Sequence, residues 1–222
     1  MHKHLEERLF HPSSRPAGHG ITIGTPSFYD LSVRLLFAGR RRRAYRTLLA
    51  AAQVQPGHRV LDVGSGPGYF ARILAEAVGP EGSVVGIDAA PEMSEYANRK
   101  AAHLSNCRFQ PGTAESLAFP DAAFDVVVSS LVLHHLPEEA RLQAVREMKR
   151  VLRPGGRVLL AEFRIPERGF WRRLALLTGH EEMERRVPAL EPLVTAAGFE
   201  ELGSGQAPPW LSYTRAAKPP LP

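Results

Sequence analysis

Two acids and a run of glycines in the first half of the chain have the types and spacing of a nucleotide-binding site. The acids are Asp62 and Asp88, each at the end of an apolar run, and the glycines are Gly64, Gly66 and Gly68. Glycine permits sharp turns and lets a ligand approach the backbone closely. An acid about twenty residues beyond such a turn can accept hydrogen bonds from both hydroxyls of a ribose. The pattern therefore predicts a ligand of the adenosine type.

The residues that flank the glycines predict the elements that position them. The run VLDV at 60–63 is apolar and β-branched, which is typical of a strand covered on both faces. After Gly68 the apolar residues recur at helical spacing, which predicts an amphipathic helix whose free N-terminal amides face the turn. Gly66, Gly68 and Ala71 also satisfy the G-x-G-x-x-A fingerprint, so the glycines alone leave a dinucleotide ligand open.

Four segments, in a fixed order, carry a more specific signal. They are VLDVGSGPGYF at 60–70, VVGIDAAPEM at 84–93, GTAESLAFPDAAFDVVVSSLVLHHL at 112–136 and LRPGGRVLLAEF at 152–163. With these segments the chain resembles the class I S-adenosylmethionine-dependent methyltransferases, in particular the ubiquinone/menaquinone biosynthesis C-methyltransferase-like group. The resemblance extends over about half of the chain. It implies S-adenosylmethionine as the cofactor and says little about the methyl acceptor.

The same resemblance implies an α/β fold. The implied architecture is a Rossmann-like, seven-stranded, mostly parallel sheet with helices on both faces and an antiparallel C-terminal hairpin. Alternation of strands and helices supports the parallel sheet. The predicted strands lie near 59–63, 83–88, 106–110, 124–129 and 157–163, and the hairpin strands near 199–203 and 210–216. Pro137 opens a predicted helix with a buried stripe at Leu142, Val145 and Met148, and residues 154–156 are predicted to form a turn before the fifth strand.

The resemblance also implies which residues hold each part of the cofactor. Asp62 would reach the ammonium of the methionine part directly or through water, and Asp88 would hold the ribose hydroxyls. The methionine part would further be surrounded by the turn Gly64, Ser65 and Gly66 and faced by the backbone at Ser129 and Ser130, and Gly68 would also belong to the cofactor site. The adenine would pack on Ala89 and Met93 and lie beside Thr113, Ala114 and Glu115. Relatives often have Asp where this chain has Thr113, and a hydroxyl holds the adenine amino group less strongly than a carboxylate does.

Three residues are candidates for catalysis. His134 and His135 follow the fourth predicted strand close to the cofactor, and an imidazole titrates near neutral pH. A structural role of both histidines is the alternative, since related sequences of diverse substrate preference share the pattern. Tyr29 lies in a helix that, by resemblance, covers the cofactor, and Glu162 is a further candidate for the base or for substrate orientation. No metal site is predicted, because HEEME at 180–184 lacks the second histidine of a zincin motif.

These features predict methyl transfer to a small, apolar or aromatic acceptor by in-line displacement. A nicotinamide-dependent oxidoreductase is the alternative enzyme, and a non-catalytic, cofactor-binding regulatory protein is the alternative outside enzymes. Nucleic acid is not expected as a partner, because nucleic-acid methyltransferases that modify amino groups would, by resemblance, have N/D-P-P-Y/F where this chain has SSLV at 129–132.

Composition and charge set the remaining expectations. A chain of 222 residues with 44% hydrophobic content can bury one full core. We expect a flexible segment at 1–26 and one methyltransferase domain at 27–222, with a helical cap at 27–55 and a substrate-side insertion at 164–190. A cytoplasmic location is predicted, because the start of the chain has no apolar signal region and no stretch reaches membrane-spanning length. The single cysteine, Cys107, is predicted to pack in a strand.

A basic run from Arg40 to Arg46 accompanies a net charge of +5. We interpret it first as the solvated face of a helix. Peripheral contact with a membrane or a lipophilic substrate is the second reading, because basic amphipathic helices can lie on membrane surfaces. The oligomeric state stays open.

Overall fold

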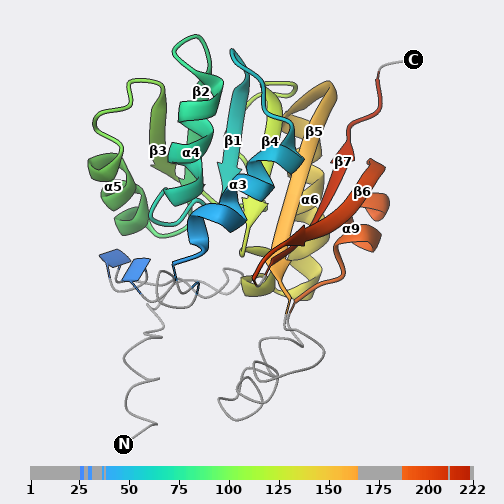
Figure 1. Ribbon diagram of the computed structural model, residues 1–222. Coiled ribbons are helices and arrows are strands. Elements are labelled where there is room, and N and C mark those ends of the chain that lie inside the picture. The colour runs from blue at the N-terminus through green and yellow to red at the C-terminus, as the bar shows by residue number, and fades with distance from the viewer. Residues whose placement is uncertain are drawn as a thin grey trace, which may run out of the picture.

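The computed structural model describes residues 26–27, 30–31, 37, 39–164, 187–209 and 211–220. Its centre is a seven-stranded sheet with the strand order β3-β2-β1-β4-β5-β7-β6 (Figure 1). The strands are β1 Arg59–Val63, β2 Ser83–Asp88, β3 Cys107–Pro111, β4 Phe124–Ser130, β5 Leu152–Phe163, β6 Glu200–Ala207 and β7 Leu211–Ala217. Strands β1 to β5 pair in parallel, whereas β7 runs antiparallel to both β5 and β6. This arrangement confirms the predicted fold class.

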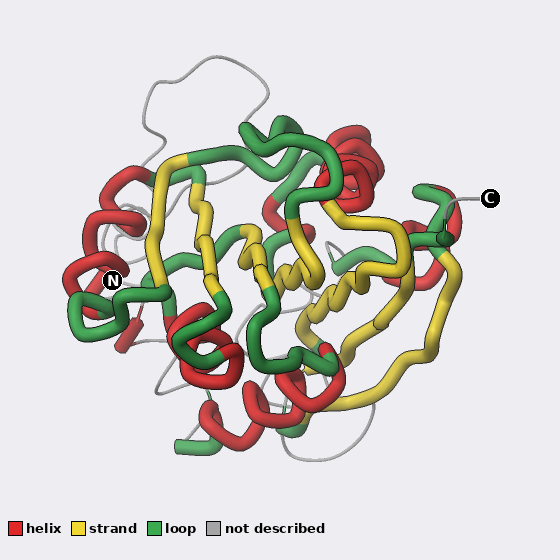
Figure 2. The backbone as a smooth tube through the Cα atoms, turned by 90° about the horizontal axis from the view of Figure 1, so that it is seen from above, coloured by secondary structure: helices red, strands yellow, loops and turns green. Residues whose placement is uncertain are grey.

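Helices cover both faces of the sheet (Figures 1 and 2). One face carries α3 Arg41–Ala52, α4 Tyr69–Val78 and α5 Pro91–Lys100, and the other carries α6 Glu138–Val151 and α9 Leu190–Ala196. The short helix η1 Leu133–His135 follows β4. Strand residues alternate between the two layers, because successive side chains point to opposite faces. In β1, Val60 packs with α3 and α4, whereas Leu61 and Val63 pack in the layer of α6.

The sheet order reverses between β1 and β4. The chain runs outward from β1 to β2 and β3, and then returns to place β4 on the other side of β1. The carboxyl ends of β1, β2, β4 and β5 therefore share one edge of the sheet, which is the lower edge in Figure 1. The loops that the sequence predicts to contact the cofactor lie at this edge.

Two details of the sequence-based fold were wrong. Residues 154–156 do not form a turn before the fifth strand but an irregularity within β5, where the pairing shifts between Phe124 and Val126 of β4. The reason is that Lys218, just beyond β7, keeps this segment in the sheet: Gly155 N–H donates to Lys218 O, and Lys218 N–H donates to Gly156 O. In α6 the predicted stripe is confirmed for Val145 and Met148, but Leu142 is only partly buried.

Several predicted features lie outside the described residues. These are most of the segment 1–26, Tyr29, and residues 165–186 of the predicted substrate-side insertion. The domain boundaries therefore stay predictions. Among the helices that the structure describes, none is both long and apolar enough to cross a bilayer.

Candidate cofactor site

A small cavity lies where the carboxyl ends of β1 and β4 meet, at the reversal of the strand order. Open parallel sheets bind ligands at such a switch point, because the loops after the two strands leave in opposite directions. The cavity has a volume of about 30 Å³. It is lined by residues of α3, of the glycine turn, of the start of α4 and of the end of β4.

Asp62 on β1 is a buried acid that lines this cavity. The residue is 2% exposed, and the backbone N–H of Ala71 donates a hydrogen bond to its carboxylate. Its Oδ2 atom is buried and has no hydrogen-bond partner within the described part of the chain. Burial, with a smaller contribution from the charge of Asp88, raises the pKa of Asp62 from 3.8 to about 7. Such a carboxylate is stabilised in its charged form by a cationic hydrogen-bond donor.

The glycine turn needs its glycines for both conformation and space. Gly64, Gly66 and Gly68 all have positive φ angles, of 71°, 49° and 74°. A Cβ atom on Gly64 would lie 2.2 Å from Cγ2 of Val132, in the loop after β4. The turn therefore packs directly against the β4 loop, and a side chain at Gly64 would push the two apart.

Asp88 at the end of β2 fastens this turn. Its Oδ2 accepts the N–H of Gly66 at 2.9 Å, and its Oδ1 accepts the N–H of Ala90 at 3.0 Å. Burial raises the pKa of Asp88, and these two hydrogen bonds act in the opposite direction. Each carboxylate oxygen keeps a further lone pair. The predicted role toward the ribose hydroxyls is thus compatible with the geometry and stays a prediction.

The residues predicted to border the adenine lie next to the end of β2. Gly112 N–H donates to Asp88 O at 2.9 Å, so the segment 113–115 begins beside Asp88. Thr113 pairs with Ser116 in an isolated bridge, Ala114 is buried and Glu115 is partly buried. On the other side of Asp88, Ala89 is exposed and Met93 is buried at the start of α5. Their contacts with adenine stay predictions.

The serines at the end of β4 lie on opposite sides of the strand. Ser129 Oγ donates to Val63 O at 3.0 Å and thereby ties β4 to β1. Ser130 lines the cavity. The next residue, Leu131, has a positive φ of 64°, which is unusual for a leucine and turns the chain sharply after the strand.

Glu162 on β5 holds this sharp turn in place. The residue is 1% exposed, and its Oε1 accepts the backbone N–H groups of Val132 at 3.2 Å, Leu133 at 2.8 Å and His134 at 3.4 Å. Its Oε2 lies 2.7 Å from Nδ1 of His134. These four contacts hold the loop after β4, and sequence reasoning did not identify this structural role of Glu162. The catalytic roles of His134 and His135 stay predictions. Nδ1 of His134 is engaged by Glu162.

Arg41 is a member of the site that sequence reasoning missed. The interpretation of the basic run as a solvated face is wrong for this residue, which is 8% exposed and lines the cavity. A signal was present, because Arg41 shares the helical spacing i, i+3, i+4, i+7 with the buried residues Ala44, Tyr45 and Leu48. Its neighbours in the run, Arg40, Arg42, Arg43 and Arg46, are exposed as expected.

Comparison with known proteins agrees with this geometry. Residues 60–156 match the sequence profile of a methyltransferase domain. The demethylmenaquinone methyltransferase of Deinococcus radiodurans is 40% identical over 144 residues, which are 64% of this chain and 58% of that protein. The chain spans about half the length of the curated relatives it matches first.

Solved structures show the same fold at lower identity. A methyltransferase from Aquifex aeolicus superposes with a TM-score of 0.70 at 23% identity, covering 87% of this chain and 98% of the other. The 4+2 cyclase SpnF superposes with a TM-score of 0.64 at 22% identity, covering 93% of this chain and all of the other. The sequence matches place the domain at 60–156 in a methyltransferase family, and the solved structures show the shared fold alone.

S-adenosylmethionine is the cofactor of this family, and the residues present fit it. Its amino-acid end carries an ammonium group, and the open Oδ2 of buried Asp62 is a suitable acceptor for that group. The backbone at Gly64 and Gly66 has no side chain that would block a ligand. Within the described residues, no group of three His, Cys, Asp or Glu side chains is arranged to hold a metal ion.

Proposed function

We propose that this protein transfers the methyl group of S-adenosylmethionine to a small acceptor of apolar or aromatic character. The observation that carries the proposal is the buried acid Asp62, whose Oδ2 has no hydrogen-bond partner among the described residues and which lines a cavity with the glycine turn and the end of β4. The membership of the domain in a methyltransferase family and the names of its relatives support the same reaction.

The cofactor supplies a methyl group that is already activated by a sulfonium. The chain then has to bind and orient the two reactants and keep water out. Asp62 would bind the ammonium, Asp88 would bind the ribose, and the loop fixed by Glu162 would close the methionine side. Correct alignment for in-line displacement can contribute about 7 to 11 kcal/mol toward the barrier.

A general base is needed only for an acceptor that arrives protonated. Glu162 is unsuited to this task, because its carboxylate already accepts from three N–H groups and contacts His134. His134 could act only through Nε2, since Glu162 takes Nδ1. Acceptors at carbon, oxygen or nitrogen all remain compatible with such a site. The relative named demethylmenaquinone methyltransferase favours a quinone-type ring as the first acceptor to test.

Methyl transfer has to be measured directly, because a cyclase shares the fold. The purified chain is incubated with S-adenosylmethionine labelled in the methyl group and a panel of reduced quinones, phenols and amines. We expect labelled product from at least one aromatic acceptor, and loss of product in Asp62→Ala. Binding of S-adenosylhomocysteine without transfer to any acceptor would favour the non-catalytic regulatory protein. Binding of NAD in its place would favour the oxidoreductase.

The exposed arginines of α3 suit a negatively charged surface. Arg42, Arg43 and Arg46 are exposed, and within the described residues none of them makes an ion pair. The apolar side of α3 is buried against the domain, so this helix offers charge but no apolar side for insertion. We therefore propose that this helix makes reversible electrostatic contact with an anionic membrane or with a lipophilic substrate. We propose no contact with nucleic acid.

A further inference from the structure

Arg41 brings a buried positive charge to the same cavity as Asp62. The Arg41 side chain is 10% exposed, and its guanidinium carbon lies 3.8 Å from the centre of the Tyr69 ring. This stacking fixes the plane of the guanidinium. The Nε atom is buried and has no hydrogen-bond partner among the residues that the structure describes. A buried guanidinium N–H without an acceptor is costly, so it indicates a missing ligand group.

Two residues that line the cavity therefore each have one polar atom without a partner among the described residues, and the two atoms are of opposite chemistry. The open Oδ2 of Asp62 requires a donor, and the open Nε of Arg41 requires an acceptor. An α-amino acid in its zwitterionic form carries both partners on one carbon atom, an ammonium and a carboxylate. A guanidinium edge also matches a carboxylate in shape, since two N–H groups can donate side by side.

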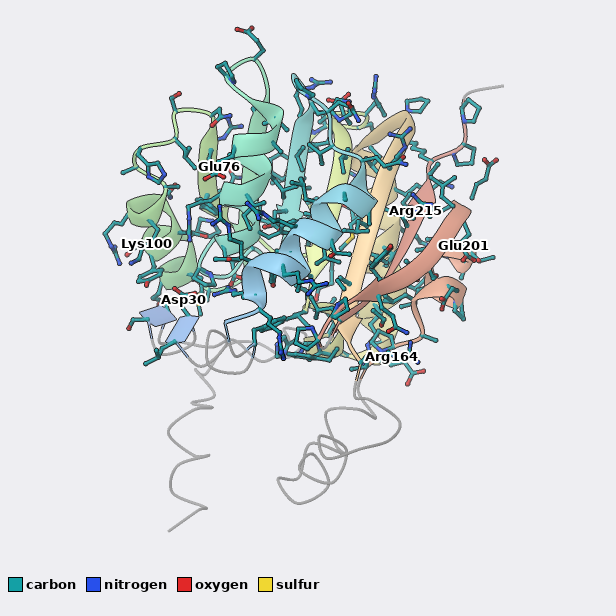
Figure 3. The ribbon with its side chains drawn as sticks, viewed as in Figure 1. Asp30, Glu76, Lys100, Arg164, Glu201 and Arg215 are labelled. Carbon is teal, nitrogen blue, oxygen red and sulfur yellow. The ribbon has the colours of Figure 1, made fainter. Side chains whose placement is uncertain are left out.

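A second contact links Arg41 to the chain before α3. Nη1 of Arg41 donates to Oδ1 of Asp30 at 2.6 Å, and Asp30 is 30% exposed. Asp30 lies at the lower edge of the molecule, the edge at which the parallel strands end (Figure 3). One guanidinium of a cavity-lining residue thus donates to Asp30 through Nη1 and has no acceptor for Nε among the described residues.

We propose that Arg41 binds the α-carboxylate of the cofactor's amino-acid end, and that Asp30 positions the guanidinium for this contact. The inference rests on the proposed function, because it concerns the same cofactor. It assigns a binding residue and a positioning residue that lie outside the motifs carrying the family resemblance.

The test compares two ligands that differ only in the carboxylate. S-adenosylhomocysteine has both the ammonium and the carboxylate, and S-adenosyl-3-thiopropylamine has the ammonium alone. Calorimetry on the full chain should show that the wild type prefers S-adenosylhomocysteine by about 10- to 100-fold, as for a charge-assisted pair. Arg41→Met should lose most of this preference, and the exposed neighbour variant Arg42→Met should keep it. Arg41→Lys should fall between them, because an ammonium cannot donate as a fork.

The outcomes separate this inference from the proposed function. Equal affinity of the wild type for the two ligands would overturn the role of Arg41. This measurement uses the wild type alone and does not depend on the folding of a variant. An unchanged preference in a folded Arg41→Met would overturn it as well. Binding of neither ligand by the wild type would instead reject the proposed cofactor.

The role of Asp30 is tested on the same two ligands. Asp30→Asn should reduce the affinity for S-adenosylhomocysteine by about 2- to 10-fold and leave that for S-adenosyl-3-thiopropylamine unchanged. If Asp30→Asn weakens both ligands equally, or neither, Asp30 does not position Arg41 for the carboxylate.

Discussion

Replacing Asp62 by Asn should change the pH dependence of both stability and ligand binding. The pKa of Asp62 is raised from 3.8 to about 7, mainly by burial. The folded chain therefore holds a proton at this site at pH values where the unfolded chain has lost it. The stabilisation linked to this proton is complete below pH 4 and is lost as the pH rises through about 7. A shift of this size corresponds to about 4 kcal/mol.

The stability effect is measured by urea unfolding at pH 5 and pH 7.5. Asn has the shape of the protonated acid but does not titrate, so the variant avoids the cost of a buried charge. We expect the free energy of unfolding of Asp62→Asn, relative to that of the wild type, to increase by a few kcal/mol between the two pH values. A pH-independent difference between the two proteins would refute the assignment of a raised pKa to Asp62.

The binding effect has the opposite sign. An ammonium ligand pairs with the ionised form of Asp62, and the ionised fraction rises as the pH passes 7. Between pH 5.5 and 7.5 the affinity of the wild type for S-adenosylhomocysteine should increase by about 10- to 30-fold. In Asp62→Asn the affinity should be low and nearly constant over this range. A wild-type affinity that is constant or falls with pH, measured by calorimetry at fixed ionic strength, would contradict the proposed ammonium contact.

Three further predictions concern the turn, the β4 loop and the basic helix. Gly64→Ala should cost at least about 2 kcal/mol more in urea unfolding than Gly57→Ala, because both have positive φ but only position 64 is crowded; equal costs would contradict the close packing. Glu162→Gln should lower the free energy of unfolding by about 2 to 4 kcal/mol, as expected for a buried carboxylate with several donors. A loss under about 0.5 kcal/mol, which is typical of surface substitutions, would show that Glu162 does not hold the loop. The double change Arg43→Gln and Arg46→Gln should reduce cosedimentation with phosphatidylglycerol vesicles at low salt without affecting phosphatidylcholine vesicles; unchanged cosedimentation would reject the membrane contact.

The parts of the fold set by local sequence were predicted well. The strand at 60–63, the glycine turn and the amphipathic helix after Gly68 depend on residues close together in the chain, and the structure confirms them. The alternation of strands and helices implies a helix between the second and third strands, but the bounds of α5 were not predicted, although Pro91 and Glu92 are typical of a helix start. Its short sequence has few apolar residues, so hydrophobic periodicity alone does not reveal it.

The parts that depend on distant contacts were not predictable in the same way. The irregularity at 154–156 exists because Lys218 pairs with it from beyond β7. The role of Glu162 follows from the register of β4 and β5, which brings its carboxylate under the N–H groups of residues 132–134. Arg41 has a clear helical position, but only the packing of α3 shows that this residue lines the same cavity as Asp62.

The central claim is that the cavity beside Asp62 holds the amino-acid end of S-adenosylmethionine. Calorimetric titration of the full chain at pH 7.5 with S-adenosylhomocysteine and, separately, with NAD tests this most directly. We predict one S-adenosylhomocysteine bound per chain, weakened in Asp62→Ala, and no binding of NAD at the same concentration. Binding of NAD without binding of S-adenosylhomocysteine would contradict the claim.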